Sequence, residues 1–401
     1  MNRVAITGIG VVSPLGENTQ DVSVALRGGI SAIGPLTLTP TDNLLVKIGA
    51  EVPDFDPKAY FDDKRLSLLD RCAQFALVAA REAVSASKLD FRGGLGDRCA
   101  AIIGSGIGGI GTLDEGFRRL YAEGAKRFNP LTIPKMMISA AVSHITMEHG
   151  IRGPAFTIGS ACASANHAIG VAFQMVRAGA VEVAVTGGTE SVFSLGPLKA
   201  WEAMRILAPD TCRPFSRGRQ GLVLGEGAGM VVLENFERAT ARGADIFGEI
   251  VGFGMSSDAC DIVLPSLEGA AQAMRACVAD SGLATEQFDY INAHGTGTIM
   301  NDLTETRAIR AVFGDHADRL GVSSTKSMHG HALGAAGAIE LVATLLAMRD
   351  GFVPPTANFV AADPECDLDY VPNQARQAPI TAALSNSFAF GGLNAVLAVR
   401  R

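Results

Sequence analysis

The sequence has few aromatic side chains and no closely spaced pair of cysteines, and the spacing of the cysteines argues against two classes of protein. Aromatic residues make up only 6% of the 401 residues. The seven cysteines are an odd, scattered set without a C-x-x-C pair, which argues against a zinc site and a disulfide framework. We therefore predict no metal site. The N-terminal residues lack a signal-peptide profile, so we expect a cytoplasmic protein with reduced thiols.

Long apolar runs and positive charge are also missing. The longest apolar run, around residues 335–348, is interrupted by Glu340 and is too short to cross a bilayer, so no transmembrane segment is expected. The net charge of −7 argues against nucleic acid as a partner, because phosphate binding needs a clustered basic surface. The net charge does not exclude an acidic protein partner, because a local group of four cations could bind one. The same four cations could equally form a solvated helix face: Arg118, Arg119, Lys126 and Arg127.

Glycine and alternating strand and helix patterns are abundant. The 46 glycines, with 48% hydrophobic and 19% charged residues, indicate a large core built with tight turns. Short β-branched runs alternate with helix-period segments, which predicts βαβ units with sheets covered on both faces. Predicted strands are 4–7, 101–104, 181–187, 230–234, 289–292, 321–324, 382–385 and 395–399; predicted helices include 70–87, 163–178, 267–280 and 334–348. A charged segment near 234–252 divides two packed halves, 1–247 and 248–401.

Cys162 has an unusual backbone setting. A predicted strand ends at Ile158, small residues make a tight turn, and a helix begins at or just after the cysteine. A helix N-terminus lowers a thiol pKa and favours the thiolate, so Cys162 is a candidate nucleophile. A buried structural thiol is the competing interpretation, and we prefer it for Cys72, Cys99, Cys260, Cys277 and Cys366, whereas Cys212 is expected in an exposed turn.

Two histidines also lie just after predicted strands and among small residues, as Cys162 does. His294 stands in a glycine- and threonine-rich segment in which Thr296 and Thr298 offer hydroxyls to a ligand arm. His331 is expected at a helix start, where the dipole favours the neutral ring. Lys326 adds a positive charge nearby, and Glu340 can offset it.

A fourth glycine-rich segment, residues 385–394, ends in Phe390-Gly391-Gly392-Leu393-Asn394. Its small residues and two phenylalanines fit a loop that covers a pocket while offering backbone N–H groups. An oxyanion hole could combine the N–H of Cys162 with one from this loop.

The four segments together, in this order and over the whole chain, resemble the β-ketoacyl-acyl carrier protein synthases of the elongating type, in the thiolase superfamily. The resemblance implies an α/β fold of five layers, α-β-α-β-α, made of two similar halves, and a homodimer. It also implies decarboxylative condensation of an acyl thioester on the cysteine with malonyl-carrier protein. No cofactor is expected, because phosphopantetheine arrives on the acyl- or malonyl-loaded acyl carrier protein.

The resemblance also implies a role for each matching residue. Cys162, His294 and His331 form the catalytic triad, Lys326 matches the family's catalytic lysine five residues before the second histidine, and Glu340 matches the supporting acidic residue. Phe390 is the gate, with its N–H in the oxyanion hole. The remaining matches are Thr296 and Thr298 for the pantetheine arm and Ile107 for the acyl channel.

Residues 204–215 form a shorter stretch than in the housekeeping enzymes, and residues 257–262 lack the histidine that is common there. Residues 198–205 and 258–263 resemble the nodulation protein E branch, which makes specialised acyl chains. Acyl length, saturation and pathway stay open. A thiolase would need a second reactive cysteine in the C-terminal loop, a starter-type synthase would replace His331 by asparagine, and a non-catalytic chain-length subunit would normally lack the nucleophile. A dinucleotide-binding oxidoreductase is disfavoured because G-x-G-x-x-G is not met.

Overall fold

Ten strands form one mixed sheet in the computed structural model, which describes residues 1–401. Their order is β10-β9-β13-β14-β8-β1-β7-β6-β4-β5. The bounds are β1 Val4–Val12, β4 Cys99–Gly104, β5 Ala155–Ile158, β6 Val183–Glu190, β7 Gly227–Asn235, β8 Gly248–Ser257, β9 Tyr290–Asn292, β10 Gly321–Ser323, β13 Ala382–Ala389 and β14 Leu393–Arg400.

The sheet consists of two halves with the same topology. Five strands precede residue 236 and five follow residue 247. When the strands of each half are numbered in chain order, their order across the sheet from the outer edge is 3-2-4-5-1 in both halves. Strands 3, 2 and 4 are parallel to one another, and strand 5 is antiparallel to strands 4 and 1. The halves join where Val4–Ile6 of β1 pair with Gly248–Ile250 of β8. The prediction of two similar halves is confirmed.

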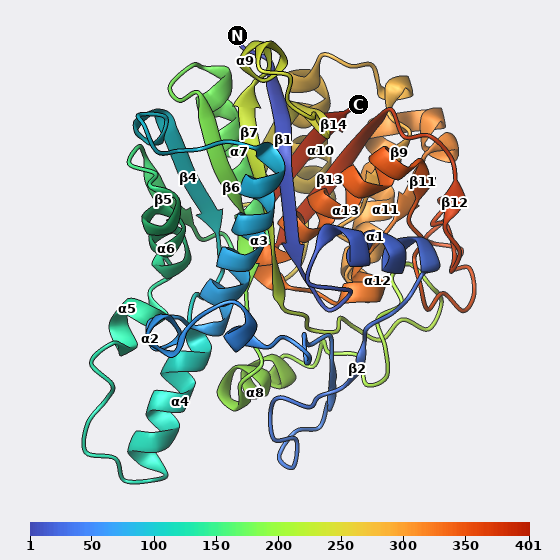
Figure 1. Cartoon of the computed structure of the whole chain (residues 1–401). Coiled ribbons are helices and arrows are strands. Elements are labelled where there is room, and N and C mark those ends of the chain that lie inside the picture. The colour runs from blue at the N-terminus through green and yellow to red at the C-terminus, as the bar shows by residue number, and fades with distance from the viewer.

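Helices complete the five layers (Figure 1). The central layer is α7 (Ser164–Arg177) and α13 (Ala336–Asp350), which pack against each other and against strands of both halves. On the outer faces, α3 (Arg71–Ser87) and α6 (Ala140–His149) cover the first half, and α10 (Leu267–Ser281) covers the second with α11 (Ile299–Phe313) packed on it. The expected α-β-α-β-α architecture is therefore present.

The central helix α13 has no polar face. Every residue from Ala336 to Met348 is buried, as expected for a helix that is apolar all round. Glu340 is the one acidic side chain in this buried stretch, so it requires a partner in the interior.

The remaining elements connect these layers or extend from them. They are α1 Thr19–Gly28, α2 Asp63–Leu66, α4 Ile110–Tyr121, α5 Thr132–Met136, α8 Leu195–Ala203, α9 Phe236–Ala241 and α12 Lys326–His329, and the short strand pairs β2 Gly34–Pro35 with β3 Ile48–Gly49 and β11 Phe352–Val353 with β12 Arg376–Gln377. In Figure 1 α4 projects from the body below α2 and α5. No helix combines the length and the apolar character that a membrane crossing requires.

Candidate active site

Cys162 lies in a strained turn between β5 and α7. The preceding residue, Ala161, has a φ of 48°, a left-handed conformation that is rare outside glycine and often marks a functional site. Ser164 stabilises the turn, because its Oγ accepts the N–H of Ser160 at 2.9 Å and donates to the carbonyl of Ala161 at 2.7 Å. The predicted strand–turn–helix setting of the cysteine is confirmed.

The thiol is buried beside His331, whose Nε2 lies 3.1 Å from Sγ. Burial raises the pKa of Cys162 to about 12, although Lys326 and the N–H groups of Phe390 and Cys162 act in the opposite direction. Desolvation thus outweighs these groups. The expected lowering of the pKa is wrong: the resting thiol keeps its proton, and a neighbouring base has to remove it.

His294 follows β9 and is fixed through its backbone. The N–H groups of His294 and Gly295 each donate to the carboxylate of Glu305 at 2.8 Å. The side chain of Asn386, on β13, donates to the same carboxylate at 3.0 Å. Glu305 and Asn386 were not predicted as site residues, because they lie 11 and 92 residues from His294 (305 − 294 and 386 − 294) and nothing in the local sequence shows that their side chains meet there.

The side chain of Lys326 sets the tautomer of His294. Its Nζ donates to the carbonyl of His294 at 2.7 Å, lies 3.4 Å from Nδ1 of the ring, and forms an ion pair with Glu340. An ammonium group has no acceptor, so Nδ1 accepts and the ring proton is on Nε2. Burial raises the pKa of Glu340 to about 7, against the pull of Lys326.

Both histidine rings are neutral and adjacent. Burial, together with the charge of Lys326, holds the pKa values of His294 and His331 well below their usual range. The ring centroids are 5.3 Å apart, and the planes are nearly perpendicular at 84°. Neutral imidazoles can donate hydrogen bonds to a developing anion, as the sequence predicted.

The local backbone of His331 differs from the prediction. His331 pairs with Leu224 in an isolated bridge, and its N–H donates to the carbonyl of Val223 at 2.7 Å. The long helix α13 begins only at Ala336. Burial and Lys326, rather than a helix dipole, therefore keep this ring neutral. His329 bonds to Thr325 and to the carbonyl of Gly330 instead of facing the thiol.

A cavity of about 300 Å³ leads to these groups. Cys162, His294, His331, Thr296, Thr298 and Phe390 all line it. The ring of Phe390 stacks on Trp201, with centroids 6.1 Å apart. The hydroxyls of Thr296 and Thr298 are 2.9 Å apart. Ile107 is not among the lining residues and is 40% exposed, so its place in an acyl channel stays a prediction.

None of the other cysteines lines this cavity. Cys72, Cys99, Cys277 and Cys366 are buried as expected. The predictions for two were wrong: Cys260 is exposed, and Cys212 is buried with its thiol 3.5 Å from the carbonyl of Thr296.

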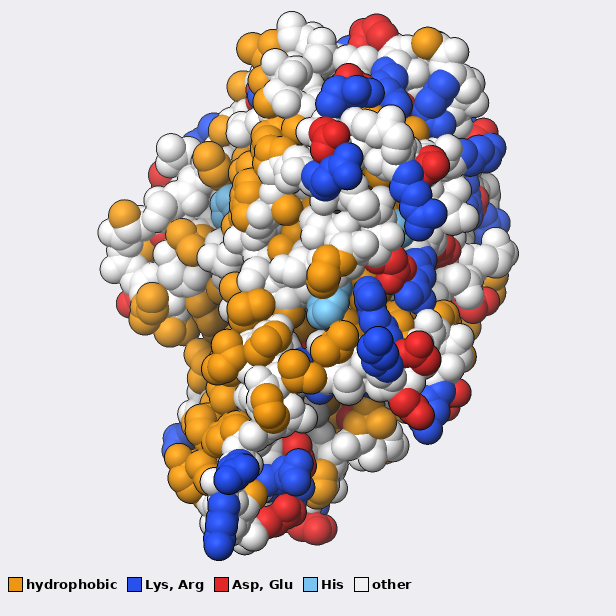
Figure 2. All heavy atoms as spheres, turned by 60° about the vertical axis from the view of Figure 1, so that its left-hand side comes forward, with side chains coloured by type: hydrophobic (Ala, Val, Ile, Leu, Met, Phe, Trp, Pro, Cys, Tyr) orange, Lys and Arg blue, Asp and Glu red, His pale blue; other side chains and the backbone are white.

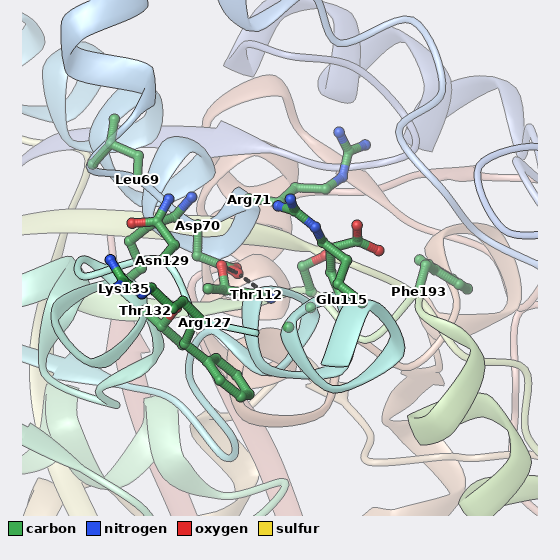
Figure 3. Close-up of a pocket in the computed structure, with 15 residues that line it drawn as sticks. Leu69, Asp70, Arg71, Thr112, Glu115, Arg127, Asn129, Thr132, Lys135 and Phe193 are labelled. Atoms are coloured by element: carbon green, nitrogen blue, oxygen red, sulfur yellow. Dashed lines mark hydrogen bonds between the residues drawn. The ribbon is translucent and has the colours of Figure 1, made fainter. Parts of the chain in front are cut away.

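A second cavity, of about 380 Å³, opens between the start of α3 and α4 (Figure 3). Most of the residues that line it are polar or charged, and none of the predicted catalytic residues contributes. Asp70 accepts the N–H and hydroxyl of Thr112 at 3.0 and 2.6 Å, and Arg71 pairs with Glu226. No carboxylate lies within ion-pair distance of three further lining cations: Arg119, Arg127 and Lys135.

Comparison with known proteins gives consistent matches over the whole chain. Residues 1–239 match "Beta-ketoacyl synthase, N-terminal domain", and residues 247–360 match "Beta-ketoacyl synthase, C-terminal domain". The chain is 50% identical to Nodulation protein E of Rhizobium sp. (strain N33) over 100% of its own length and 99% of the relative. It is 41% identical to 3-oxoacyl-[acyl-carrier-protein] synthase 2 of Staphylococcus aureus (strain N315), covering 100% and 98%. The solved ishigamide ketosynthase/chain length factor superposes with a TM-score of 0.95 at 37% identity, covering 100% and 99%.

Proposed function

Because the chain belongs to the β-ketoacyl synthase family of condensing enzymes, we propose that it elongates an acyl group held on Cys162 with malonyl units delivered by acyl carrier protein. The observation that carries this proposal is the thiol of Cys162 3.1 Å from Nε2 of His331, with His294 adjacent, at the end of one cavity. The chain is an acyltransferase, and the assignment of steps to residues is our proposal.

In the first half-reaction the acyl group moves from the carrier to the enzyme. Nε2 of His331 takes the proton of the Cys162 thiol as the sulfur attacks the thioester carbonyl. The N–H groups of Cys162 and Phe390 stabilise the oxyanion. The carbon–sulfur bond to the carrier then breaks, and the departing carrier thiolate receives the proton from His331.

In the second half-reaction malonyl-carrier protein loses carbon dioxide. The Nε2–H groups of His294 and His331 donate to the thioester oxygen of the enolate that forms. Nδ1 of His331 has no hydrogen-bond partner in the protein, so this ring can carry its proton on either nitrogen. It can therefore take part in both half-reactions. The enolate carbon attacks the acyl group on Cys162, a 3-oxoacyl-carrier is released, and the cysteine thiolate takes up a proton from water, so that one full cycle consumes one proton.

Mass spectrometry after incubation with an acyl-carrier protein tests the first step, and the adduct is expected on Cys162. His294→Ala is expected to lower malonyl decarboxylation by about 100- to 1000-fold and to leave acylation largely intact, since His294 does not contact the thiol. His331→Ala should slow both steps. His149→Ala, outside the cavity, is the matched control. An adduct on another residue, or full decarboxylation by either variant, contradicts the proposal.

The carrier protein is the proposed partner, bound through its acidic surface at basic residues near the second cavity. Arg118 is neutralised by Glu115 and Glu123, whereas no ion pair involves Arg119, Lys126 or Arg127. Charge reversal at Lys126 and Arg127 should raise the KM for acyl-carrier protein and reduce its salt dependence. The rate with a carrier-free pantetheine thioester serves as control and should not change. Equal loss with both substrates would contradict this docking surface.

A second copy of the chain is proposed to cover the free edge of the sheet. β5 is the last strand on that side, and Figure 2 shows hydrophobic side chains gathered across the face that carries it. Exposed apolar residues on or near β5 and α5 include Ile133, Met137, Ile138, Met147 and Phe156. Such a patch suits a self-complementary interface. Phe156→Lys should shift the mass measured by light scattering from dimer to monomer, and a wild-type monomer would refute the proposal.

A specialised acyl chain is the second candidate for the substrate, because identity is 50% to Nodulation protein E and 41% to the synthase 2 relative. A panel of saturated and unsaturated acyl-carrier proteins from six to eighteen carbons separates the two possibilities. Preference for unsaturated chains supports the specialised substrate, and preference for saturated chains supports ordinary elongation.

A further inference from the structure

Glu190 is a buried acidic residue that the mechanism above does not use. It ends β6 and is 0% exposed. No lysine or arginine forms an ion pair with it. A buried carboxylate without a cation is expensive unless hydrogen bonds compensate, so its partners indicate what it does.

Four donors converge on this carboxylate. Oε1 accepts the hydroxyl of Ser105 at 3.1 Å and the N–H of Ile107 at 3.3 Å. Oε2 accepts the N–H of Gly106 at 2.6 Å and the N–H of Gly334 at 3.1 Å. Each oxygen thus faces two donors, which favours the ionised carboxylate. Burial acts in the opposite direction and raises the pKa of Glu190 to about 7, so the carboxylate is ionised above neutral pH.

Three of the donors lie in the turn that follows β4, beside the segment that leads to Cys162, and the fourth lies in the segment that carries His331. The N–H of Ser105 donates to the carbonyl of Ile158 at 3.2 Å, at the end of the strand that leads to Cys162. Gly334 lies three residues after His331. The two segments also touch directly, since a Cβ on Gly334 would come within 2.3 Å of the N–H nitrogen of Gly106. Glu190 therefore joins the turn behind the nucleophile to the turn that follows its base.

We infer that Glu190 is a positioning residue that holds Cys162 and His331 in reacting geometry through its four hydrogen bonds. The inference rests on the proposed function of that pair. The charge has a second effect that supports it, because the Glu190 carboxylate helps to raise the pKa of the nearby Cys162 thiol. Removing the carboxylate should therefore disturb the geometry and release the thiol proton more easily at the same time.

The test uses Glu190→Gln in the full-length enzyme, with Glu226→Gln as the matched control. Glu226 is also fully buried, but it pairs with Arg71 and accepts from Ser191. Glu190→Gln should slow single-turnover acyl transfer to Cys162 by about 100-fold, as expected for a misplacement near 1 Å. Iodoacetamide should alkylate its Cys162 faster than in the wild type between pH 7 and 9. Glu226→Gln should show neither the slower acyl transfer nor the faster alkylation of Cys162.

The circular dichroism spectrum and the urea midpoint of Glu190→Gln should match those of the wild type, because partial unfolding would also slow acyl transfer and would expose the buried Cys162 thiol to alkylation. Wild-type acyl transfer by Glu190→Gln, or equal losses in both variants, would overturn the inference. If Glu190→Gln fails to fold, Glu190→Asp keeps the charge and shortens the reach; it should slow acyl transfer without faster alkylation, and wild-type transfer would again overturn the inference. Failure of the wild-type enzyme to acylate Cys162 would instead refute the proposed function.

Discussion

Replacing Glu340 by leucine should destabilise the protein by leaving Lys326 alone in the interior. Both side chains are 0% exposed, and they form an ion pair. Without the carboxylate, Nζ retains only the carbonyl of His294 at 2.7 Å and the ring Nδ1 at 3.4 Å. Removing one member of a buried pair costs about 3–5 kcal/mol, whereas replacing both by apolar residues is often neutral. The double variant Lys326→Met/Glu340→Leu should therefore be more stable than Glu340→Leu.

Urea unfolding can measure this difference. Trp201 is the only tryptophan, so its fluorescence reports on the cavity, and far-ultraviolet circular dichroism reports on the whole fold; coincident transitions would justify a two-state treatment. We expect Glu340→Leu to lower the midpoint at an unchanged slope. The double variant should recover most of that loss but decarboxylate malonyl substrate poorly, because Nδ1 of His294 has lost its donor. A wild-type midpoint for Glu340→Leu, or a double variant no more stable than the single, would refute the reasoning.

Further expected results concern the thiol and the packing behind it. With a pKa near 12, Cys162 should be alkylated by iodoacetamide at a rate that keeps rising between pH 8 and 10, since the thiolate fraction grows with pH; a plateau below pH 9 would contradict a buried, protonated thiol. Gly104→Ala should destabilise the fold by about 1–3 kcal/mol or more, because the new Cβ would lie 2.4 Å from the backbone at the start of α7. Gly111→Ala, with its nearest neighbour at 3.8 Å, is the control and should be neutral in thermal unfolding. Between about pH 4.5 and 7, the raised pKa of Glu340 makes the folded state bind the extra proton, so its contribution to the free energy of unfolding should fall as pH rises through that window; Glu340→Gln should flatten this part of the stability profile.

Much of the site could be predicted because its members stand where strands end. Cys162, His294 and Phe390 each follow a β-branched or apolar run and have glycine or small neighbours, and the structure brings all three to one cavity. Local sequence suffices for such positions, because the strand pattern fixes which edge of the sheet they reach.

Features that depend on distant contacts could not be predicted. The pKa of Cys162 is set by burial, which no local segment reveals, and the backbone of His331 is held by Val223 and Leu224, more than a hundred residues away. Strand β8 was missed because Gly248, Gly252 and Gly254 interrupt its β pattern; a Cβ at the latter two would strike the backbone of α10. Glycine is present there to allow the helix to approach, which is visible only in the folded structure.

The place of β1 in the centre of the sheet has a consequence for synthesis of the chain. Residues 4–12 leave the ribosome long before their partners β7 and β8, which begin at Gly227 and Gly248. At about 5–20 residues per second, this apolar strand waits roughly 10–40 s before a partner exists. During that time its edges are free to pair with other chains. The nascent first half should therefore bind chaperones until translation passes the middle of the sequence.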